Sequence, residues 1–313
     1  MKNIFIFCLL FILSACTQMQ KNHKAEKSQN YAQKDSQAVL IDSGSSKPTP
    51  AKAEDNKDRV PKLGLILGPG SVKAFAHTGV IKELVKAGIN VSYIVGIEWG
   101  ALVGGMYAST AKINDTEWKL YKLQEKKLHE GNWFSSNKKI ITISAYKDFF
   151  QQNIGDKNIK DLEIPFACPS VSIWSGAIVW QESGSLQKAI EHCMPSPPLF
   201  KPKGPWMAAL YANEEAVEFL QKKGMDVVLY VDVLGASQPL GTKDLMNEYT
   251  SALLWQELKR DIHRIKSHDA VVKVEANTLQ FQLYDFNARS SLASAGEKAG
   301  LQAADILVEN YNF

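Results

Sequence analysis

The five residues Gly96-Ile97-Glu98-Trp99-Gly100 constrain the fold of this chain more than any other feature. They follow an apolar, β-branched run over residues 91–97 and precede a helix-favouring run over residues 101–108. This strand–turn–helix context and the glycine spacing are those of a nucleophile elbow, G-x-S-x-G. A glutamate, Glu98, stands at the position of the serine. The segment therefore predicts the scaffold of a serine hydrolase without its attacking hydroxyl.

Strand and helix patterns alternate from residue 63 onward. Residues 63–67 predict a strand, residues 68–73 a turn of small residues, and residues 74–86 a helix that ends at Gly88. With the strand at 91–97 they form a βαβ unit, which requires parallel strands. Further strands are expected at 165–173, 177–180, 226–231 and 271–274, and helices at 114–128, 146–152, 186–193, 214–223, 245–265 and 290–307. The prediction is an α/β fold of three layers, with helices on both faces of a mostly parallel sheet.

The first 15 residues have the pattern of a secretory signal, with Lys2 before an apolar stretch of about 10 residues that is too short to span a bilayer. Leu13-Ser14-Ala15-Cys16 resembles a bacterial lipobox, in which cleavage precedes the cysteine and its sulfur carries lipid. The alternative is an ordinary cleaved signal with a chance cysteine. Thr17 after Cys16 resembles an outer-membrane sorting signal. We therefore expect a palmitoylated lipoprotein on the periplasmic side of the outer membrane of a bacterial cell envelope.

Residues 16–60 would then comprise the lipidated cysteine and a disordered tether, because this stretch is polar and poor in large apolar residues. The folded domain is expected to span residues 61–313. Of the four cysteines, Cys8 leaves with the signal and Cys16 carries lipid, so that Cys168 and Cys193 remain. They could pair in an oxidising compartment or stay as buried thiols, and both readings are open.

Composition narrows the classes of partner. The formal net charge is +3, and no basic cluster interleaved with aromatic residues occurs, so nucleic-acid binding has no support. The six histidines show no metal-ligand spacing, and we expect neither a metal nor a cofactor.

The order of several segments resembles bacterial patatin-like phospholipases. The glycine-rich opening is Leu67-Gly68-Pro69-Gly70-Ser71-Val72-Lys73-Ala74, and the elbow with its helix is residues 95–108. The other matching segments are residues 183–186, 189–190, 195, 200–202, 224–228, 283–286 and 295–296, so that the resemblance runs from Pro61 to Phe313. It implies a patatin-like fold and a hydrolase of lipid metabolism that cleaves lipid esters with a Ser–Asp dyad, while backbone N–H groups of the glycine loop stabilise the oxyanion.

This chain departs from the family pattern at four places. Glu98 replaces the serine, and the register counted back from Gly224 puts Ala208 at the aspartate position. Pro69 lacks an N–H, and Ser71 and Ala74 replace permissive glycines, which we expect to restrict the loop donors. Gly68, Gly70 and Lys73 remain as remnants of the oxyanion loop, and Gly96, Trp99 and Gly100 as the frame of the elbow.

Several roles are open at this stage. Glu98 either forms an ion pair with Lys73 or points to solvent. Trp99 either covers the pocket mouth or packs in the core. The tryptophans Trp174, Trp180 and Trp206 either line an acyl groove or pack ordinarily, and His77 is expected to be a packed or surface residue.

The sequence favours a membrane-anchored patatin-like phospholipase homologue that is catalytically inactive, a pseudoenzyme, and that binds lipid, an acyl chain or an envelope partner protein. The alternative is an active lipid acyl hydrolase with a non-standard nucleophile, for which composition offers Ser71, Ser175 and Ser196. A third reading is an envelope scaffold without a ligand.

Overall fold

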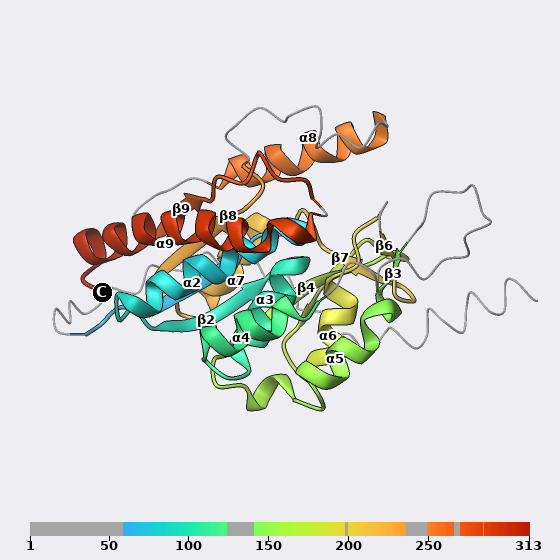
Figure 1. Ribbon diagram of the computed structural model, residues 1–313, viewed down its shortest axis with the longest axis horizontal. Coiled ribbons are helices and arrows are strands. Elements are labelled where there is room, and N and C mark those ends of the chain that lie inside the picture. The colour runs from blue at the N-terminus through green and yellow to red at the C-terminus, as the bar shows by residue number, and fades with distance from the viewer. Residues whose placement is uncertain (1–58, 124–140, 198–199, 236–248, 266–269, 284) are drawn as a thin grey trace, which may run out of the picture. The chain divides into compact units, whose positions relative to one another are not determined.

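A mostly parallel β-sheet forms the centre of the folded part of the chain (Figure 1). Its spatial order is β5-β4-β2-β1-β8-β9, with β1 (Leu63–Leu67), β2 (Val91–Gly96), β4 (Phe166–Ser172), β5 (Ile178–Gln181), β8 (Val227–Asp232) and β9 (Val271–Glu275). The strands β4, β2, β1, β8 and β9 run parallel, whereas β5 and β7 (Trp206–Ala208) both pair antiparallel with β4. The short strands β3 (Ile141–Thr142) and β6 (Phe200–Lys201) pair with each other.

This computed structural model describes residues 59–123, 141–197, 200–235, 249–265, 270–283 and 285–313. They belong to one unit that runs from Asp58 to Phe313. The predicted signal, Cys16 and nearly all of the predicted tether lie outside the described residues, so these predictions stay untested. No helix among the described residues is both long and apolar enough to cross a bilayer.

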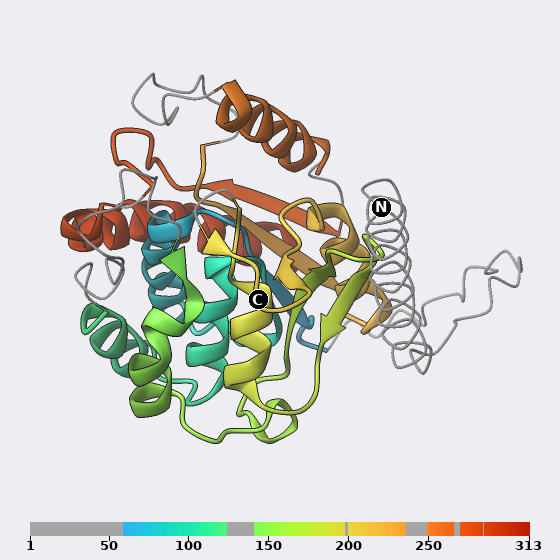
Figure 2. The same ribbon diagram turned by 90° about the vertical axis from the view of Figure 1, so that its right-hand side faces the viewer.

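Helices cover both faces of the sheet because its strands are apolar on both sides. Leu65 and Leu67 of β1 belong to a core with α2 (Ala76–Lys86), α3 (Trp99–Ala108), α6 (Leu186–Cys193) and α9 (Arg289–Tyr311). Ile66, between them, belongs to a second core with α7 (Asn213–Lys222) and α8 (Tyr249–Arg264). Alternate side chains of a strand point to opposite faces, and Figure 2 shows α6 and α8 on opposite sides of the strands. The predicted three-layer α/β/α architecture is thereby confirmed.

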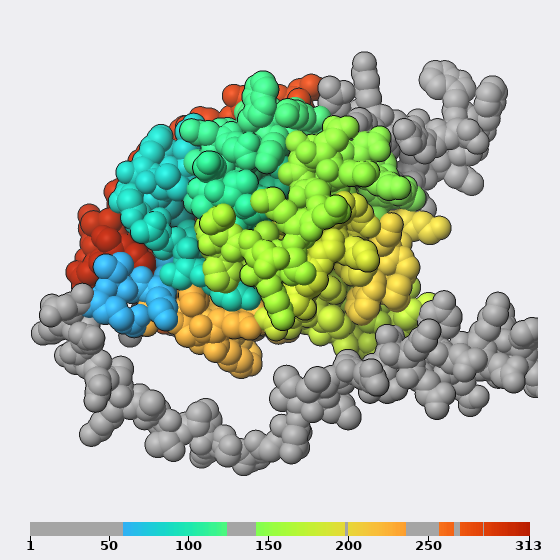
Figure 3. Space-filling view, turned by 90° about the horizontal axis from the view of Figure 1, so that it is seen from below, coloured from blue at the N-terminus to red at the C-terminus, as the bar shows by residue number. Residues whose placement is uncertain are grey.

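The remaining helical segments lie at the periphery or in the connections. They are α4 (Ile113–Tyr121), α5 (Lys147–Asn153) and the short 3₁₀ turns η1 (Ser71–Phe75), η3 (Ile143–Tyr146), η4 (Ile159–Asp161) and η5 (Phe286–Ala288). Figure 3 shows the face formed largely by the segments from α2 to α6.

The helices α2 and α9, far apart in the sequence, pack backbone against backbone. A Cβ added to Gly79 of α2 would lie 2.0 Å from the carbonyl oxygen of Ala293, and one added to Gly296 of α9 would lie 1.8 Å from that of Ala76. Only glycine fits at these two contacts, so the C-terminal helix is fixed in one register on the first helix.

Most predicted elements are present, with bounds shifted by a few residues. The helix expected over residues 74–86 begins as η1 and continues as α2, and the one expected over 114–128 is described as α4, with residues 124–128 outside the described part. The predictions missed β7, together with β3 and β6, because these strands have two or three residues each.

Candidate functional site

Glu98 occupies the tip of a sharp turn between β2 and α3. Its backbone has φ 56° and ψ −120°, a positive φ that side-chain-bearing residues rarely adopt. Both flanking glycines are required by sterics: a Cβ on Gly96 would lie 2.4 Å from the Cα of Ala101, and one on Gly100 would lie 2.1 Å from the carbonyl oxygen of Leu67. The elbow predicted from the spacing is therefore present, with a glutamate held where the serine would attack.

Glu98 is 2% exposed, and its carboxylate accepts four hydrogen bonds. Three backbone N–H groups donate to Oε2: Gly70 at 3.1 Å, Ser71 at 2.8 Å and Trp99 at 2.9 Å. The hydroxyl of Ser196 donates to Oε1 at 2.9 Å. We call the three converging N–H groups the donor site; Glu98 fills it with one of its own oxygens.

The donor site corrects one expectation about the glycine-rich loop. Pro69, Ser71 and Ala74 were expected to restrict the inward-pointing donors, yet two of the three donors come from Gly70 and Ser71. Ser71 reaches this orientation with φ 52°, and the N–H of Val72 donates to the carbonyl of Leu283 at 2.9 Å. These tertiary hydrogen bonds offset the backbone strain, so the loop still directs its donors inward despite the three substitutions.

Burial raises the pKa of the Glu98 carboxyl above its usual value, and the four hydrogen bonds lower it in part. The solvent-facing placement predicted as one of two alternatives is wrong, because the side chain is buried. The other alternative, an ion pair with Lys73, stays a prediction. Lys73 is itself 1% exposed and lies on η1, which follows directly on the loop that supplies Gly70.

Ala208, at the predicted aspartate position, is linked to Glu98 by the Pro195–Ser196 segment. The N–H of Ala208 donates to the carbonyl of Pro195 at 2.7 Å, and the next residue, Ser196, contacts Glu98. The Ala208 side chain is a buried methyl group that can neither accept nor move a proton. The structure thus brings Glu98, Ser196 and Ala208 to one place, although sequence reasoning offered Ser196 on composition alone.

Ala208 also lines an apolar pocket of about 380 Å³. The β4–β5 hairpin contributes Val171, Gly176 and Ile178, and the segment after β7 contributes Leu210 and Tyr211. The other lining residues are Pro197, Met207, Ala209, Ala212 and Glu215. The pocket adjoins the segment that carries Ser196, and its lining suits a hydrocarbon chain.

Trp99 is a core residue. It is 1% exposed and packs edge-on against Tyr146, Phe200 and Phe286, at ring distances of 6.0–6.2 Å. Its backbone N–H nevertheless belongs to the donor site, because the residue after the nucleophile position of an elbow usually donates there.

The three other tryptophans considered do not line one groove. Trp180 stacks on Phe219 and Trp206 stacks on His192, whereas Trp174 is 74% exposed.

His77 is fully buried, and its Nε2 donates to the carbonyl of Gly68 at 2.9 Å. This hydrogen bond ties α2 to the glycine-rich loop. Burial lowers its pKa to about 4, which keeps the imidazole neutral. Of the other serines considered, Ser175 lies on an exposed turn, while the Ser71 hydroxyl is buried with no hydrogen-bond partner among described atoms.

Cys168 of β4 and Cys193 of α6 form a disulfide, which answers the question left open by the sequence. The bond ties α6 to the sheet next to the loop that carries Ser196. Among the described residues, no group of three or more His, Cys, Asp or Glu side chains is placed to hold a metal ion.

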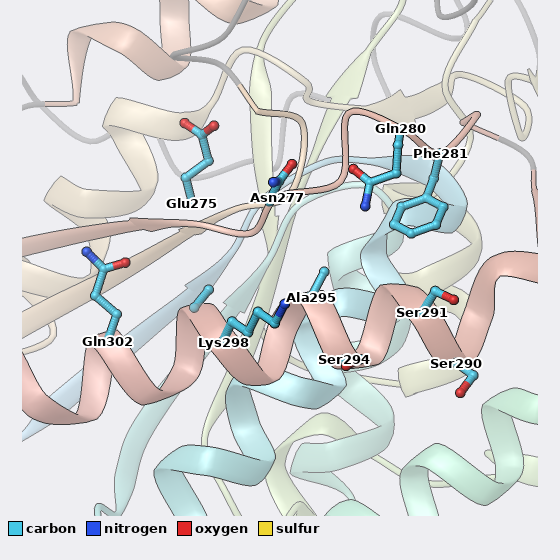
Figure 4. A pocket seen from close by; sticks show the side chains of 11 residues that line it. Glu275, Asn277, Gln280, Phe281, Ser290, Ser291, Ser294, Ala295, Lys298 and Gln302 are labelled. Atoms are coloured by element: carbon cyan, nitrogen blue, oxygen red, sulfur yellow. The ribbon is translucent and has the colours of Figure 1, made fainter.

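A separate polar pocket of about 640 Å³ lies between α9 and the segment after β9 (Figure 4). Lys298 and three serines of α9 line it together with Glu275, Asn277 and Gln280. Neither Glu98 nor Ala208 lines this pocket.

Comparisons with known proteins identify related sequences. A family model described as patatin-like phospholipase matches residues 65–232. An uncharacterised NTE family protein of Mycobacterium tuberculosis is 28% identical over 155 residues, which cover 50% of this chain and 43% of that protein. Human patatin-like phospholipase domain-containing protein 6 is 27% identical over 222 residues, or 66% of this chain and 16% of that protein. The chain thus spans less than half the length of these relatives.

Among solved structures, VipD from Legionella pneumophila superposes with a TM-score of 0.49 at 11% identity, over 79% of this chain and 67% of that one. The family match covers more than half of the chain, including the end of β1, the glycine-rich loop, the elbow and β8. The chain belongs to the patatin-like phospholipase family.

Proposed function

We propose that this protein is a membrane-anchored patatin-like domain that holds a lipid acyl chain and does not hydrolyse its ester. The observation that carries the proposal is the occupied donor site, in which Gly70, Ser71 and Trp99 all donate to Oε2 of Glu98. In acyl transfer, converging N–H donors stabilise the oxyanion of the tetrahedral intermediate. Here a carboxylate oxygen of the protein takes that place, so the three donors are engaged before an ester carbonyl arrives.

The dyad positions supply neither the family's nucleophile nor its base. Attack by the Glu98 carboxylate on an ester would give a mixed anhydride, which a second group must resolve by activating water. Ala208, at the position of the family's aspartate, has only a methyl group. The arrangement therefore supports binding without turnover.

The ligand class follows from the apolar pocket beside Ala208. Its volume of about 380 Å³ falls in the usual range for small-molecule sites, roughly 300–1,000 Å³. Aliphatic and aromatic side chains dominate its lining, and Glu215 is the single charged residue among the described residues that line it. An acyl chain matches this lining better than a polar metabolite.

Membrane anchoring rests on the lipobox-like Leu13-Ser14-Ala15-Cys16. Two or more acyl chains, at about 0.8 kcal/mol per buried CH₂, hold a protein stably on a bilayer. The Cys168–Cys193 disulfide supports an oxidising compartment, such as the periplasm.

A fluorophosphonate probe and a chromogenic ester assay test the absence of turnover. We expect no labelling and no hydrolysis above the level of a Glu98→Ala, Ser196→Ala double variant. Labelling or turnover that a single substitution abolishes would overturn the proposal.

Native mass spectrometry with palmitate tests the binding site. Ile178 and Val179 are consecutive, half-buried residues of β5, and Ile178 lines the pocket, whereas Val179 does not. We expect palmitate to remain on the wild type and on Val179→Glu but to be lost from Ile178→Glu. Equal retention by the two variants would place the ligand elsewhere.

A second function, an esterase with a displaced nucleophile, is favoured by one contact. The Ser196 hydroxyl donates to Oε1 of Glu98 at 2.9 Å, which is the geometry of a serine beside a general base. Turnover would require Oε2 to leave the donor site first. In that case the fluorophosphonate label would be found on Ser196 and would vanish in both Ser196→Ala and Glu98→Gln.

A further inference from the structure

We propose that the turn between β4 and β5, residues Ile173–Ala177, inserts into the interfacial region of a phospholipid bilayer. We call this turn the hairpin tip. The inference rests on the proposed function, because it supplies the route by which an acyl chain would enter the pocket beside Ala208.

The hairpin tip exposes large apolar side chains and carries no charge. All five of its residues are exposed, with Trp174 at 74% and Ile173 at 44%. The whole segment from Ser172 to Trp180 lacks Asp, Glu, Lys and Arg. Tryptophan has an apolar body and a polar N–H, which is why it concentrates at membrane–water interfaces.

Single exposed hydrophobic residues are ordinary, and Trp118 on α4 illustrates this. Trp118 is 66% exposed, but Lys122 lies over its ring, 5.6 Å from the centroid, and Glu117 precedes it in the sequence. Charged neighbours make that site unfavourable in a bilayer. Trp174, by contrast, sits beside Ile173 on an uncharged turn.

The hairpin tip projects beyond the carboxyl-terminal ends of the parallel strands, which is the end of the sheet at which the elbow lies. Strand β4 pairs with β2 only where Phe166 and Ala167 face Ile94 and Val95. The later residues of β4, through Ser172, run on with β5 and β7 alone. At about 3.3 Å per residue, the extension over Cys168–Ser172 measures roughly 17 Å.

The same hairpin forms a wall of the apolar pocket. Val171 and Ile178 flank the tip, Gly176 belongs to it, and all three line the pocket. Tyr211, contributed by the segment after β7, is 42% exposed. A bilayer that receives Trp174 would therefore lie next to the pocket, so that a chain can pass from lipid to protein without crossing water.

The charges near the hairpin tip are mixed, which points to apolar insertion rather than attraction to anionic lipid. The N–H of Ile173 donates to the carbonyl of Pro205 at 2.8 Å, so Lys201 and Lys203 lie on the neighbouring segment. Lys203 forms an ion pair with Glu191 at 3.4 Å. We therefore expect binding to zwitterionic vesicles with little dependence on salt.

The length of the predicted tether suits this orientation. Strand β1 begins at the edge of the sheet opposite to the elbow, and Figure 3 shows the blue start of the unit and the yellow segment near residue 200 at opposite ends of one face. If residues 17–60 form the predicted tether, it would span roughly 35–40 Å on average, which is enough to let the end of the sheet that carries the elbow turn towards the membrane.

The test uses the whole lipidated chain in phosphatidylcholine vesicles, with an environment-sensitive NBD label on Trp174→Cys or on the matched control Trp118→Cys. Both positions are exposed, so the substitutions should leave folding intact. We expect the label at position 174 to shift its emission to the blue and to be quenched by spin-labelled lipid. The label at position 118 should give the same emission with vesicles as without them.

Equal emission and equal lipid quenching at the two positions would overturn the inference. Palmitate retention by native mass spectrometry is measured on the same two variants. Retention without a blue shift refutes the hairpin tip and leaves the proposed function standing, whereas a blue shift without retention supports the hairpin tip as a membrane contact and refutes the acyl site.

Discussion

Replacing Glu98 by alanine should destabilise the folded state, because four buried donors lose their acceptor at once. They are the N–H groups of Gly70, Ser71 and Trp99 and the hydroxyl of Ser196. A buried donor without a partner costs about 1–3 kcal/mol. A water of about 30 Å³ that entered the vacated space would satisfy some of the donors. Allowing for that water, we expect a loss of about 2–4 kcal/mol in the free energy of unfolding.

Glu98→Gln is the matched control. Its carboxamide oxygen can accept from the three N–H groups, and its NH₂ can donate to Ser196 once the hydroxyl rotates. Both variants keep a side chain at the same positive φ, so backbone strain cancels in the comparison. We expect Glu98→Gln to stay within about 1 kcal/mol of the wild type.

Urea denaturation followed by circular dichroism measures both variants, with the m-value as a check on two-state behaviour. If Glu98→Ala changed stability by less than about 0.5 kcal/mol, as surface substitutions do, the idea of a filled donor site would be refuted. If both variants lost the same amount of unfolding free energy, the charge of Glu98 rather than its hydrogen bonds would stabilise the fold.

The same pair gives a pH test with a defined sign. Burial raises the pKa of Glu98, so the folded protein holds its proton more tightly than the unfolded chain does. The tighter proton binding stabilises the folded state. This stabilisation is present in full below the usual pKa of 4.5 and is lost as the pH rises through the higher pKa of the folded state. Relative to Glu98→Gln, the wild type should therefore lose stability as the pH rises through this window.

Three further predictions concern other parts of the site. Burial lowers the pKa of His77 to about 4, so on acidification the unfolded chain takes up the proton first. Between pH 8 and pH 4.5 the free energy of unfolding of the wild type should therefore fall by about 2–3 kcal/mol more than that of His77→Gln, and parallel pH profiles of the two proteins would contradict this. Reducing the Cys168–Cys193 disulfide, whose partners are 25 residues apart, should lower the unfolding free energy by about 3 kcal/mol in denaturation curves with and without reductant, and identical curves would argue against the bond. Glu98→Ser with Ala208→Asp should empty the donor site and supply a dyad, raising p-nitrophenyl ester hydrolysis above that of Glu98→Ala; no increase would mean that the donor site does not accept an ester oxygen.

The frame of the site could be predicted from the sequence because it depends on local spacing. The glycines around Glu98 specify a sharp turn after an apolar strand, and sterics leave no other residue at Gly96 and Gly100. The register counted back from Gly224 placed Ala208 at the aspartate position, and the structure puts it next to the segment that contacts Glu98.

The contents of the site could not be predicted, because they depend on tertiary contacts. The inward N–H of Ser71 needs a positive φ that its residue type disfavours and that only the surrounding hydrogen bonds stabilise. Ser196 lies in a proline-rich loop with no periodic pattern, and only the fold brings it to Glu98. The disulfide between Cys168 and Cys193 likewise follows from the packing of α6 against β4, which no spacing rule expresses.

The glycine contacts between α2 and α9 set an order for folding. Helix α2 ends at Lys86, whereas α9, which packs against it, begins only at Arg289. Until α9 docks, the glycine face of α2 lacks the backbone against which it packs. Contacts between segments so far apart in a sequence form slowly during folding, so we expect the docking of α9 on α2 to be a late step.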